Sequence, residues 1–446
     1  MDLQRDIDYV LRTVESRDIR FIRLWFTDVL GRLKSFAISP EDLAIAFEEG
    51  IGFDGSSIEG FASREESDML AFPDPTTFQV LPWRPIDDGV ARIFCRIKKP
   101  NCENFEGDPR EALRRVFSYA EELGYIMNVG TEMEYFYFAD DKSPKLLDRA
   151  GYFDLTPDDP ARDLRRSTTL MLEKMSIPVE YSYHSIGHSQ QGLSLRHSEA
   201  LAQADNIMTA KYVIRLEAFN RDVHASFMPK PLPTQPGSGL FLHESLLDRE
   251  GHNVFWDPND KQYYLSDIAR HYIAGVLKYA PEFMAITNPT VNSYKRISNN
   301  TGDVPMFATW GLRNRDAMCR IPMYKPSKPG AARIELRLPD DMANPYLAIA
   351  VTLAAGLKGI EDKLELGPEV TPDMLSMSAQ ELEAHGYVRL PRSLGEALDN
   401  FEQSELMRQT LGEHIHSFFL RKKRDEWERY NSTVTDWEIE RYIASI

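Results

Sequence analysis

Alternating apolar and polar residues predict several β-strands. Ile19–Ser39 contains two apolar runs separated by a D-V-L-G turn, which is the pattern of a β-hairpin. Asn128–Phe138 and Ala331–Pro339 alternate residue by residue, so every second side chain is expected on the same face of a strand. Shorter strands are predicted at Thr77–Pro82 and Ala91–Ile97. The amino-terminal part of the chain is therefore expected to be rich in sheet.

Helical periodicity and capping residues predict the remaining elements. Pro40–Glu49 is expected to form a short helix, and Asp108–Gly124 starts at a capping aspartate and ends at a glycine. Ala343–Leu364 is long and largely apolar, which is typical of a buried helix. The carboxy-terminal part holds further helices, interrupted at Pro391 and capped again at Ser404. This mixture predicts an α+β fold.

A polar stretch separates the strand-rich start from the rest of the chain. Lys98–Pro109 contains two prolines and few apolar residues, as an inter-domain connection does. We therefore predict a small β-rich domain over residues 1–105 and a larger α+β catalytic domain over residues 106–446.

Composition and charge exclude several classes of function. The 446 residues carry 69 acidic and 52 basic side chains, a formal net charge of −17, which argues against nucleic-acid and membrane partners. Mean hydropathy is −0.41, and no apolar run reaches the ~18 residues of a membrane span. The amino terminus lacks a secretory signal, and Cys95, Cys102 and Cys319 lack metal-ligand spacing. Reduced thiols and a cytoplasmic location are the expectation.

Two carboxylates are expected side by side on one predicted strand. Glu132 and Glu134 are two residues apart, so they project from the same face about 6–7 Å apart. Their neighbours are bulky and apolar, which favours burial of at least one face. Two buried carboxylates this close need a cation or an arginine between them. The alternative is an exposed edge strand with solvated acids.

The segment R-I-E-L-R predicts a second charged face. Arg333, Glu335 and Arg337 share one side of the strand, opposite three aliphatic residues. Guanidinium groups bind phosphate and carboxylate bidentately, so this row suits an anionic ligand beside a metal ion. A ladder of cross-strand ion pairs is the alternative explanation.

Further arginines surround a polar segment near residue 300. Arg296, Arg313, Arg315 and Arg320 lie within or just after Asn292–Pro305, whose S-N-N-T-G-D run is typical of a loop. Their number in an acidic protein indicates an anionic ligand, with solvated arginines as the alternative. Together, the three groups of residues indicate a cleft for a divalent cation and anionic substrates.

The order of short motifs resembles bacterial type I glutamine synthetase. The chain contains FDGSSIEGF, the E-x-E strand, FMPKP, PGSG, NSYKR, RNR, RIELR and ANPYL in the family's order, over essentially its full length. The resemblance implies a small β-grasp domain followed by a catalytic domain built on a curved antiparallel sheet. It also implies a homododecamer of two stacked hexameric rings, with each active site between adjacent subunits.

The resemblance further implies the reaction and the groups that perform it. In the family, ATP phosphorylates the γ-carboxylate of glutamate and ammonia displaces phosphate, assisted by two Mg²⁺ or Mn²⁺ ions. The metal ligands would be Glu132, Glu134 and Glu335. Catalytic roles would fall to Asp54, which reaches a neighbouring subunit, and to Asp303 and Arg315. Substrate would contact Gly237, Arg296 and Arg337, and the nucleotide would contact His243, Ser245 and Arg333.

Several positions depart from the family pattern. Ser185 and Gly192 stand where the family has two glutamate metal ligands, and Phe241 stands where it has a histidine ligand. Asp303 is the nearest acid to the family's flap glutamate. The modification loop of some type I enzymes has a tyrosine near the position of Leu375. We therefore expect weakened metal binding and no such modification.

The histidine-rich segment around these positions has two interpretations. His184 and His188 lie close to the missing carboxylates and could bind a softer metal ion, or they could serve the structure alone. The whole chain likewise supports two hypotheses. It is an ATP-dependent ligase joining the γ-carboxyl group of glutamate, or a related acid, to ammonia or another amine. Alternatively, it is a silenced paralogue that keeps a binding or regulatory role.

Overall fold

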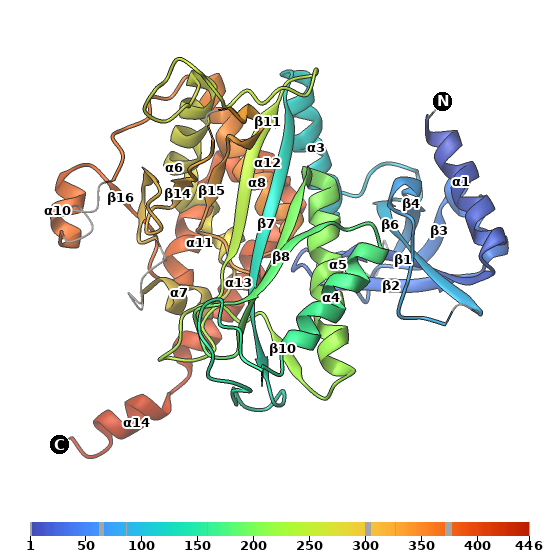
Figure 1. The fold of residues 1–446 in the computed structure, drawn as a ribbon, viewed down its shortest axis with the longest axis horizontal. Coiled ribbons are helices and arrows are strands. Elements are labelled where there is room, and N and C mark those ends of the chain that lie inside the picture. The colour runs from blue at the N-terminus through green and yellow to red at the C-terminus, as the bar shows by residue number, and fades with distance from the viewer. Residues whose placement is uncertain are drawn as a thin grey trace.

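The computed structural model describes residues 2–61, 67–85, 87–157, 159–298, 305–325, 327–370 and 377–445. An amino-terminal sheet and a central sheet organise the chain, and the smaller of the two lies at one end of the molecule (Figure 1). Each sheet has its own hydrophobic cluster. Among the described helices, none is long and apolar enough to cross a membrane.

The amino-terminal sheet has the strand order β2-β1-β6-β4-β3, with β5 also paired to β6. Parallel pairing of β1 with β6 joins two antiparallel hairpins, which is the β-grasp arrangement that the resemblance implied. Its elements are α1 Asp2–Ser16, β1 Ile19–Thr27, β2 Leu33–Ile38, η1 Pro40–Asp42, α2 Leu43–Glu49, β3 Ile51–Asp54, β4 Asp68–Pro73, η2 Pro75–Thr77, β5 Gln79–Val80 and β6 Gly89–Lys98.

Two details of this sheet differ from the sequence predictions. The strand expected at Thr77–Pro82 is only two residues long, because Asp74 accepts a hydrogen bond from Thr76 N and caps a 3-10 turn instead. Strands β3 and β4 were not predicted, since one lies in a glycine-rich segment and the other is short. The predicted hairpin at β1 and β2 is confirmed.

The central sheet has the strand order β13-β14-β15-β11-β7-β9-β8, with β10 also paired to β7. All pairs except β13 with β14 are antiparallel. Its strands are β7 Ile126–Phe138, β8 Val179–His184, β9 Gln190–Glu199, β10 His224–Ser226, β11 Leu240–Leu247, β13 Trp310–Leu312, β14 Cys319–Ile321 and β15 Ile334–Leu336. Strands β12 Phe307–Ala308 and β16 Val388–Arg389 pair separately.

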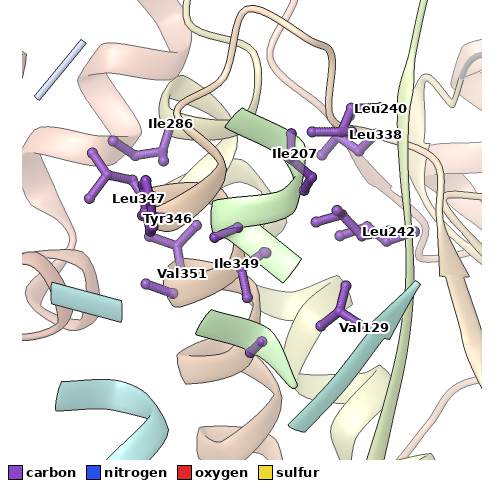
Figure 2. Packing of buried hydrophobic residues seen from close by; sticks show 14 of the residues in the cluster. Val129, Ile207, Leu240, Leu242, Ile286, Leu338, Tyr346, Leu347, Ile349 and Val351 are labelled. Carbon is purple, nitrogen blue, oxygen red and sulfur yellow. The ribbon is translucent and has the colours of Figure 1, made fainter. Parts of the chain in front are cut away.

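Helices cover one face of the central sheet. Figure 2 shows Val129, Leu240 and Leu242 of the sheet facing helix residues such as Ile207 and Ile349. The helices are α3 Pro109–Glu122, α4 Arg162–Lys174, α5 Ala200–Phe219, α6 Asp267–Thr287, α7 Val291–Ser298, α8 Pro345–Glu361, α10 Ala379–Ala384, α11 Leu394–Gln403, α12 Glu405–Leu411, α13 Glu413–Ser432 and α14 Asp436–Tyr442, with η3 at Pro329–Ala331. Helix α14 extends away from the body (Figure 1).

The predicted helix caps and the buried helix agree with the structure. Asp108 caps α3 by accepting from Arg110 N, and Ser404 caps α12 by accepting from Met407 N. Helix α8 is buried along most of its length. The strand predicted at Ala331–Pro339 is shorter than expected, because Arg337 N and Pro339 O bond singly to Met318 and Leu240 outside the ladder.

Strand alternation divides the central sheet into an apolar and a polar face. Met133 and Tyr135 of β7 are fully buried, whereas Glu132 and Glu134, which alternate with them, point to the opposite side. Leu240 and Leu242 of β11 are buried in the core, and Phe241 lies between them. The polar face therefore carries the residues that the sequence suggested for chemistry.

Glu244 is a carboxyl group on the apolar face. Its oxygens accept hydrogen bonds from Tyr272 Oη (2.8 Å) and Thr352 Oγ1 (2.7 Å). Burial raises the pKa of Glu244 to about 7, although both hydrogen bonds oppose the increase. Between the ordinary value of 4.5 and about 7, the folded chain holds a proton that the unfolded chain has released. Folding is therefore disfavoured progressively as the pH rises through this window.

We predict that Glu244→Gln becomes more stable relative to the natural chain as the pH rises. The variant cannot ionise, so it should gain on the order of 3 kcal/mol relative to the natural chain between pH 4.5 and pH 8. Thermal melting at both pH values measures this difference. Glu250→Gln, on an exposed turn, is the control and should show little change. An equal effect of Glu244→Gln at both pH values would contradict the prediction.

Candidate active site

A cavity of about 460 Å³ opens on the polar face of the central sheet. Three carboxylates and several arginines converge on it from β7, β15, α7 and the segment around β14. It is lined by Glu132, Glu134, Tyr152, Tyr181, Tyr183, Ser185, Ile186, Gln190, Pro236, Gly237, Phe241, His243, Arg296, Arg313, Arg315, Arg320, Pro322, Met323, Arg333, Glu335 and Arg337. The alternative of an exposed edge strand for Glu132 and Glu134 is excluded, because β7 is paired on both sides.

A larger cavity of about 910 Å³ lies elsewhere, among helices α3, α6, α8, α11 and α12. Its charged residues include Arg115 on α3, Glu282 on α6, and Lys358 and Glu361 on α8. They form no face of carboxylates opposed by arginines. We therefore regard the smaller cavity as the candidate active site.

Glu132 is bound by a tyrosine from the neighbouring strand region. Tyr183 Oη donates a hydrogen bond to Glu132 Oε1. Burial, followed by the nearby charges of Glu134 and Glu335, raises the pKa of Glu132 to about 7, although the Tyr183 hydrogen bond and Arg337 oppose this. The carboxyl group is thus held by the chain itself.

Two hydrogen-bond donors hold the carboxylate of Glu134 in place. Ser185 Oγ donates to Oε1 at 2.7 Å, and Gly239 N donates to Oε2 at 3.1 Å. Burial raises the pKa of Glu134, and these hydrogen bonds limit the increase. Ser185 therefore does not replace the missing carboxylate. It binds the carboxylate that remains.

Glu335 is paired with arginines. Arg320 Nη1 contacts Oε2 and Arg337 Nη1 contacts Oε1. Burial alone would raise the pKa of Glu335, but the charges of Arg337 and Arg320 lower it below the ordinary value. Because Arg320 lies opposite Glu335 across β14 and β15, the cross-strand ion pair considered from the sequence is present. The same arginines also line the cavity.

His243 is a neutral imidazole on the polar face of β11. Burial lowers its pKa to about 3, and the pKa of His197 falls to about 4 through burial and Arg333. Arg333 Nε donates to His243 Nδ1 at 3.3 Å. The proton of the neutral ring therefore lies on Nε2, which leaves His243 as a hydrogen-bond donor.

The space beside Gly192 is filled by Tyr183. Gly192 pairs with both Glu134 and Tyr183 across adjacent strands. A Cβ atom added at Gly192 would lie 2.2 Å from Tyr183 Cζ and 2.6 Å from its hydroxyl oxygen. The ring of Tyr183 thus occupies the direction in which any side chain at position 192 would extend.

The carboxylates do not form a ready-made cation site. Each of Glu132, Glu134 and Glu335 already accepts hydrogen bonds from the chain, and the three do not bring ligand atoms within 4.8 Å of one another. Among the described residues, the one group that does so is on a partly exposed surface turn, formed by Asp248, Glu250 and His252. The residues of the cavity therefore do not fit two closely held divalent ions.

Arg296 is held rigidly beneath the cavity. Its guanidinium group donates to the backbone oxygens of Leu338 (2.9 Å), Pro339 (3.2 Å) and Arg337 (3.1 Å). A Cβ atom at Gly237 would lie 2.7 Å from Arg296 Cγ and 2.7 Å from Pro229 O. Only glycine fits at position 237, which keeps the backbone close to this arginine.

Phe241 holds a second arginine in place. Its ring centroid lies 4.5 Å from the guanidinium carbon of Arg337. Phe241 also lies opposite Glu132 in the ladder between β11 and β7. An aromatic ring therefore replaces the expected histidine ligand and contacts a cationic side chain of the protein.

Some residues predicted from the sequence lie away from the cavity or outside the described residues. Ser245 is on β11, but its hydroxyl group lies near Asn128 O at 3.5 Å and does not line the cavity. Asp54 is exposed on β3 of the amino-terminal sheet and accepts from Ser56 N. Asp303 and Leu375 lie outside the residues that the structure describes.

The neighbouring histidines have structural contacts. His184 Nε2 bonds to Asp148 Oδ1 (2.9 Å) and His184 Nδ1 to Ser185 O (2.8 Å). His188 Nδ1 bonds to Ala150 O at 3.1 Å. Neither residue lines the cavity, so the structural interpretation of both is favoured.

Tyr181 and Tyr183 line the cavity but were not predicted from the sequence. The signal was present in the alternation of V-E-Y-S-Y-H, which places Tyr181 and Tyr183 on one side of β8. Contact between Tyr183 and Glu132 could not be read in this way, because it depends on the pairing of three strands.

The fold and this site together define a class of protein. A β-grasp sheet is joined to a curved sheet whose polar face gathers carboxylates and arginines, an arrangement suited to activating a carboxylate with a phosphate donor. A family model described as the glutamine synthetase β-grasp domain matches residues 18–100, and one described as the glutamine synthetase catalytic domain matches residues 106–442. The chain therefore belongs to the glutamine synthetase family, whose members are ATP-dependent ligases.

Individual relatives agree with this assignment. The chain is 48% identical to the glutamine synthetase of Mycolicibacterium smegmatis, over 99% of this chain and 100% of that protein. It is 44% identical to the glutamine synthetase of Methanosarcina mazei, over 98% and 97%. The solved structure of a GmaS/ADP complex superposes with a TM-score of 0.87 at 29% identity, covering 97% of this chain and 99% of that chain.

We predict that Gly192→Ala destabilises the chain unless Tyr183 is also shortened. Collision of the new methyl group with the Tyr183 ring should cost about 2 kcal/mol, whereas in a Tyr183→Ala background the cost should largely disappear. Thermal melting of the two single variants and the double variant measures this coupling. Gly52→Ala, in an open position on β3, is the control. Additive effects would contradict the proposed contact.

Proposed function

We propose that this protein is an ATP-dependent ligase that joins the γ-carboxyl group of glutamate, or a related acid, to ammonia or another amine. The observation that carries the proposal is the convergence of three carboxylates and six arginines on one cavity of a glutamine synthetase fold. The similar GmaS structure contains ADP, which supports a nucleotide at the corresponding cavity. We also propose that the chain is divided into two domains, residues 1–105 and residues 106–446.

The arginines have separate roles in the proposed reaction. Arg296 and Arg337 are buried and held in place, so they suit the carboxylate groups of the acid. Arg315 is exposed at the cavity and suits the phosphoryl group, where negative charge increases during transfer. Arg333 and His243 would contact the nucleotide, and Gly237 would let the backbone approach the acid.

The reaction would proceed by attack of the γ-carboxylate oxygen on the terminal phosphorus atom of ATP, releasing ADP. The amine nitrogen then attacks the acyl carbon, and the carbon–oxygen bond to phosphate breaks. Counted from the ammonium ion, the nitrogen loses one proton before the attack and a second as the amide forms, and the second passes to the departing phosphate. The protein would contribute orientation and charge stabilisation at each stage.

Divalent cations are expected to bind weakly to the protein alone. Family members use Mg²⁺ or Mn²⁺, and Glu132, Glu134 and Glu335 remain the candidate ligands. In this chain, Tyr183, Ser185 and two arginines already bind those carboxylates. Any cation has to displace these contacts, so affinity should be low without nucleotide phosphates.

Assembly into a dodecamer of two hexameric rings is part of the proposal. Asp54 lies on the amino-terminal sheet and does not line the cavity of its own chain. An exposed carboxylate there could complete the cavity of an adjacent copy. The flap role of Asp303 is proposed on the motif alone.

We predict that the protein releases ADP from ATP only when both an acid substrate and an amine are present. With glutamate, or a related dicarboxylic acid, and an amine panel, Glu335→Gln should lower kcat/KM about 100-fold, because Arg320 and Arg337 lose their anionic partner at the cavity. Coupled ADP detection measures turnover, with Glu250→Gln as the control. Absence of turnover with every acid and amine would reject the ligase and favour the silenced paralogue. The carboxylates of the cavity are already bound by Tyr183, Ser185 and two arginines, which is also compatible with a silenced paralogue.

We also predict that restoring metal ligands requires removal of Tyr183. Ser185→Glu with Gly192→Glu and Phe241→His should raise Mg²⁺ affinity at least about tenfold only when combined with Tyr183→Ala, since the tyrosine ring blocks position 192. Calorimetric titration of Mg²⁺ in the presence of a non-hydrolysable ATP analogue measures affinity. Equal gains with and without Tyr183→Ala would show that the ring is no obstacle.

A further inference from the structure

Four aromatic rings gather beside Glu132, where Tyr183 binds its carboxyl group. Tyr152 stacks on Phe153 with centroids 4.0 Å apart. The Tyr183 ring meets Phe153 at 5.3 Å, Tyr181 at 5.7 Å and Tyr152 at 5.8 Å. Tyr152, Tyr181 and Tyr183 line the cavity. We call these three residues the aromatic recess, with Phe153 behind it.

The recess is exposed but built on fixed supports. Tyr152 is 46% exposed and Tyr181 is 45% exposed, so their rings add little to the core. Phe153 N donates to His184 O at 3.1 Å, and His184 also bonds to Asp148 on the same loop. Tyr183 is held through its hydroxyl group on Glu132. The histidines of this segment therefore support the loop that carries Tyr152.

The recess lies beside two carboxyl groups of the cavity. Tyr183 donates to Glu132, and Gly192, which lies under the Tyr183 ring, pairs with Glu134 in the sheet. Among the described residues, no arginine or lysine lies over the rings of the recess, although Arg337 lies over Phe241. The half-exposed rings of Tyr152 and Tyr181 can therefore receive a cation from outside the chain.

This combination favours an organic cation over a metal ion. Tyrosine faces attract ammonium groups and also contact alkyl chains, while adjacent carboxylates attract the positive charge. Divalent ions of the Mg²⁺ type prefer oxygen ligands and gain little from aromatic faces. Ammonia is too small to use three rings, whereas an alkyl chain can lie across them.

We propose that the aromatic recess binds the amine substrate as a primary alkylammonium ion, with its charged end toward Glu132 and Glu134 and its chain against the rings. The assignment rests on the proposed ligase function and names its amine. The bound ion releases one proton to water. Its nitrogen then attacks the acyl carbon of the γ-glutamyl phosphate, phosphate leaves with the electrons of the carbon–oxygen bond, and the second proton passes to that phosphate.

Turnover tests the substrate class. With glutamate and ATP, kcat/KM for n-butylamine should exceed that for ammonia at least tenfold. Tyr181→Ala should lower the ratio of the two values about tenfold, whereas Tyr181→Phe, which keeps the ring, should preserve it. Tyr9→Ala, an exposed tyrosine on the distant helix α1, is the matched control and should leave both values unchanged. Turnover with ammonia and no preference for n-butylamine overturns the recess while leaving the ligase intact.

Binding tests the recess without turnover. Calorimetric titration of the full chain with n-butylammonium chloride should give saturable binding that Tyr181→Ala weakens about tenfold. Neutral n-butanol, which has the same chain length, should not compete. If no amine is turned over but this binding is present, the ligase fails and the recess stands. If n-butylammonium does not bind, or n-butanol binds equally well, the recess is rejected.

Discussion

The alternation of side chains along β7, β11 and β15 is the constraint on which the rest of the structure depends. Helices bury one face of these strands, and apolar residues such as Met133, Leu242 and Leu336 fill it. Since successive residues of a strand point to opposite sides, Glu132 and Glu335 are forced onto the other face. The stability of the core and the chemistry of the cavity are therefore set by the same strands, and neither can shift register alone.

On the polar face, neighbouring side chains of the protein donate hydrogen bonds to the carboxyl groups. The Tyr183 ring lies over Gly192 and its hydroxyl group binds Glu132, while Ser185 binds Glu134. Phe241 packs on an arginine in place of a metal ligand. These contacts are compatible with each other, because the absence of a side chain at Gly192 leaves room for the ring of Tyr183. The departures from the family pattern thus form one connected change.

Much of the fold and part of the site could be predicted from local patterns. The hairpin of the amino-terminal sheet, the E-x-E strand and the caps at Asp108 and Ser404 follow from signals that lie within a few residues. Strands β3 and β4 escaped prediction because glycine and short length conceal alternation. Ser245 and His243 lie two residues apart on β11 and point to the same side of the sheet, but only His243 lines the cavity. The position of a residue along its strand therefore matters as much as the face to which it points.

The sequence by itself determined the family, the two faces of each strand and the types of charged group available to the cavity. Periodicity and motif order are local properties, so they can be read without knowing how strands pair. Only the tertiary structure decided which groups meet: Tyr183 with Glu132, Arg320 with Glu335, and three tyrosine side chains in the wall of one cavity. Those contacts join residues far apart in the chain, and they depend on strand register and loop anchoring, which arise when the whole sheet is assembled.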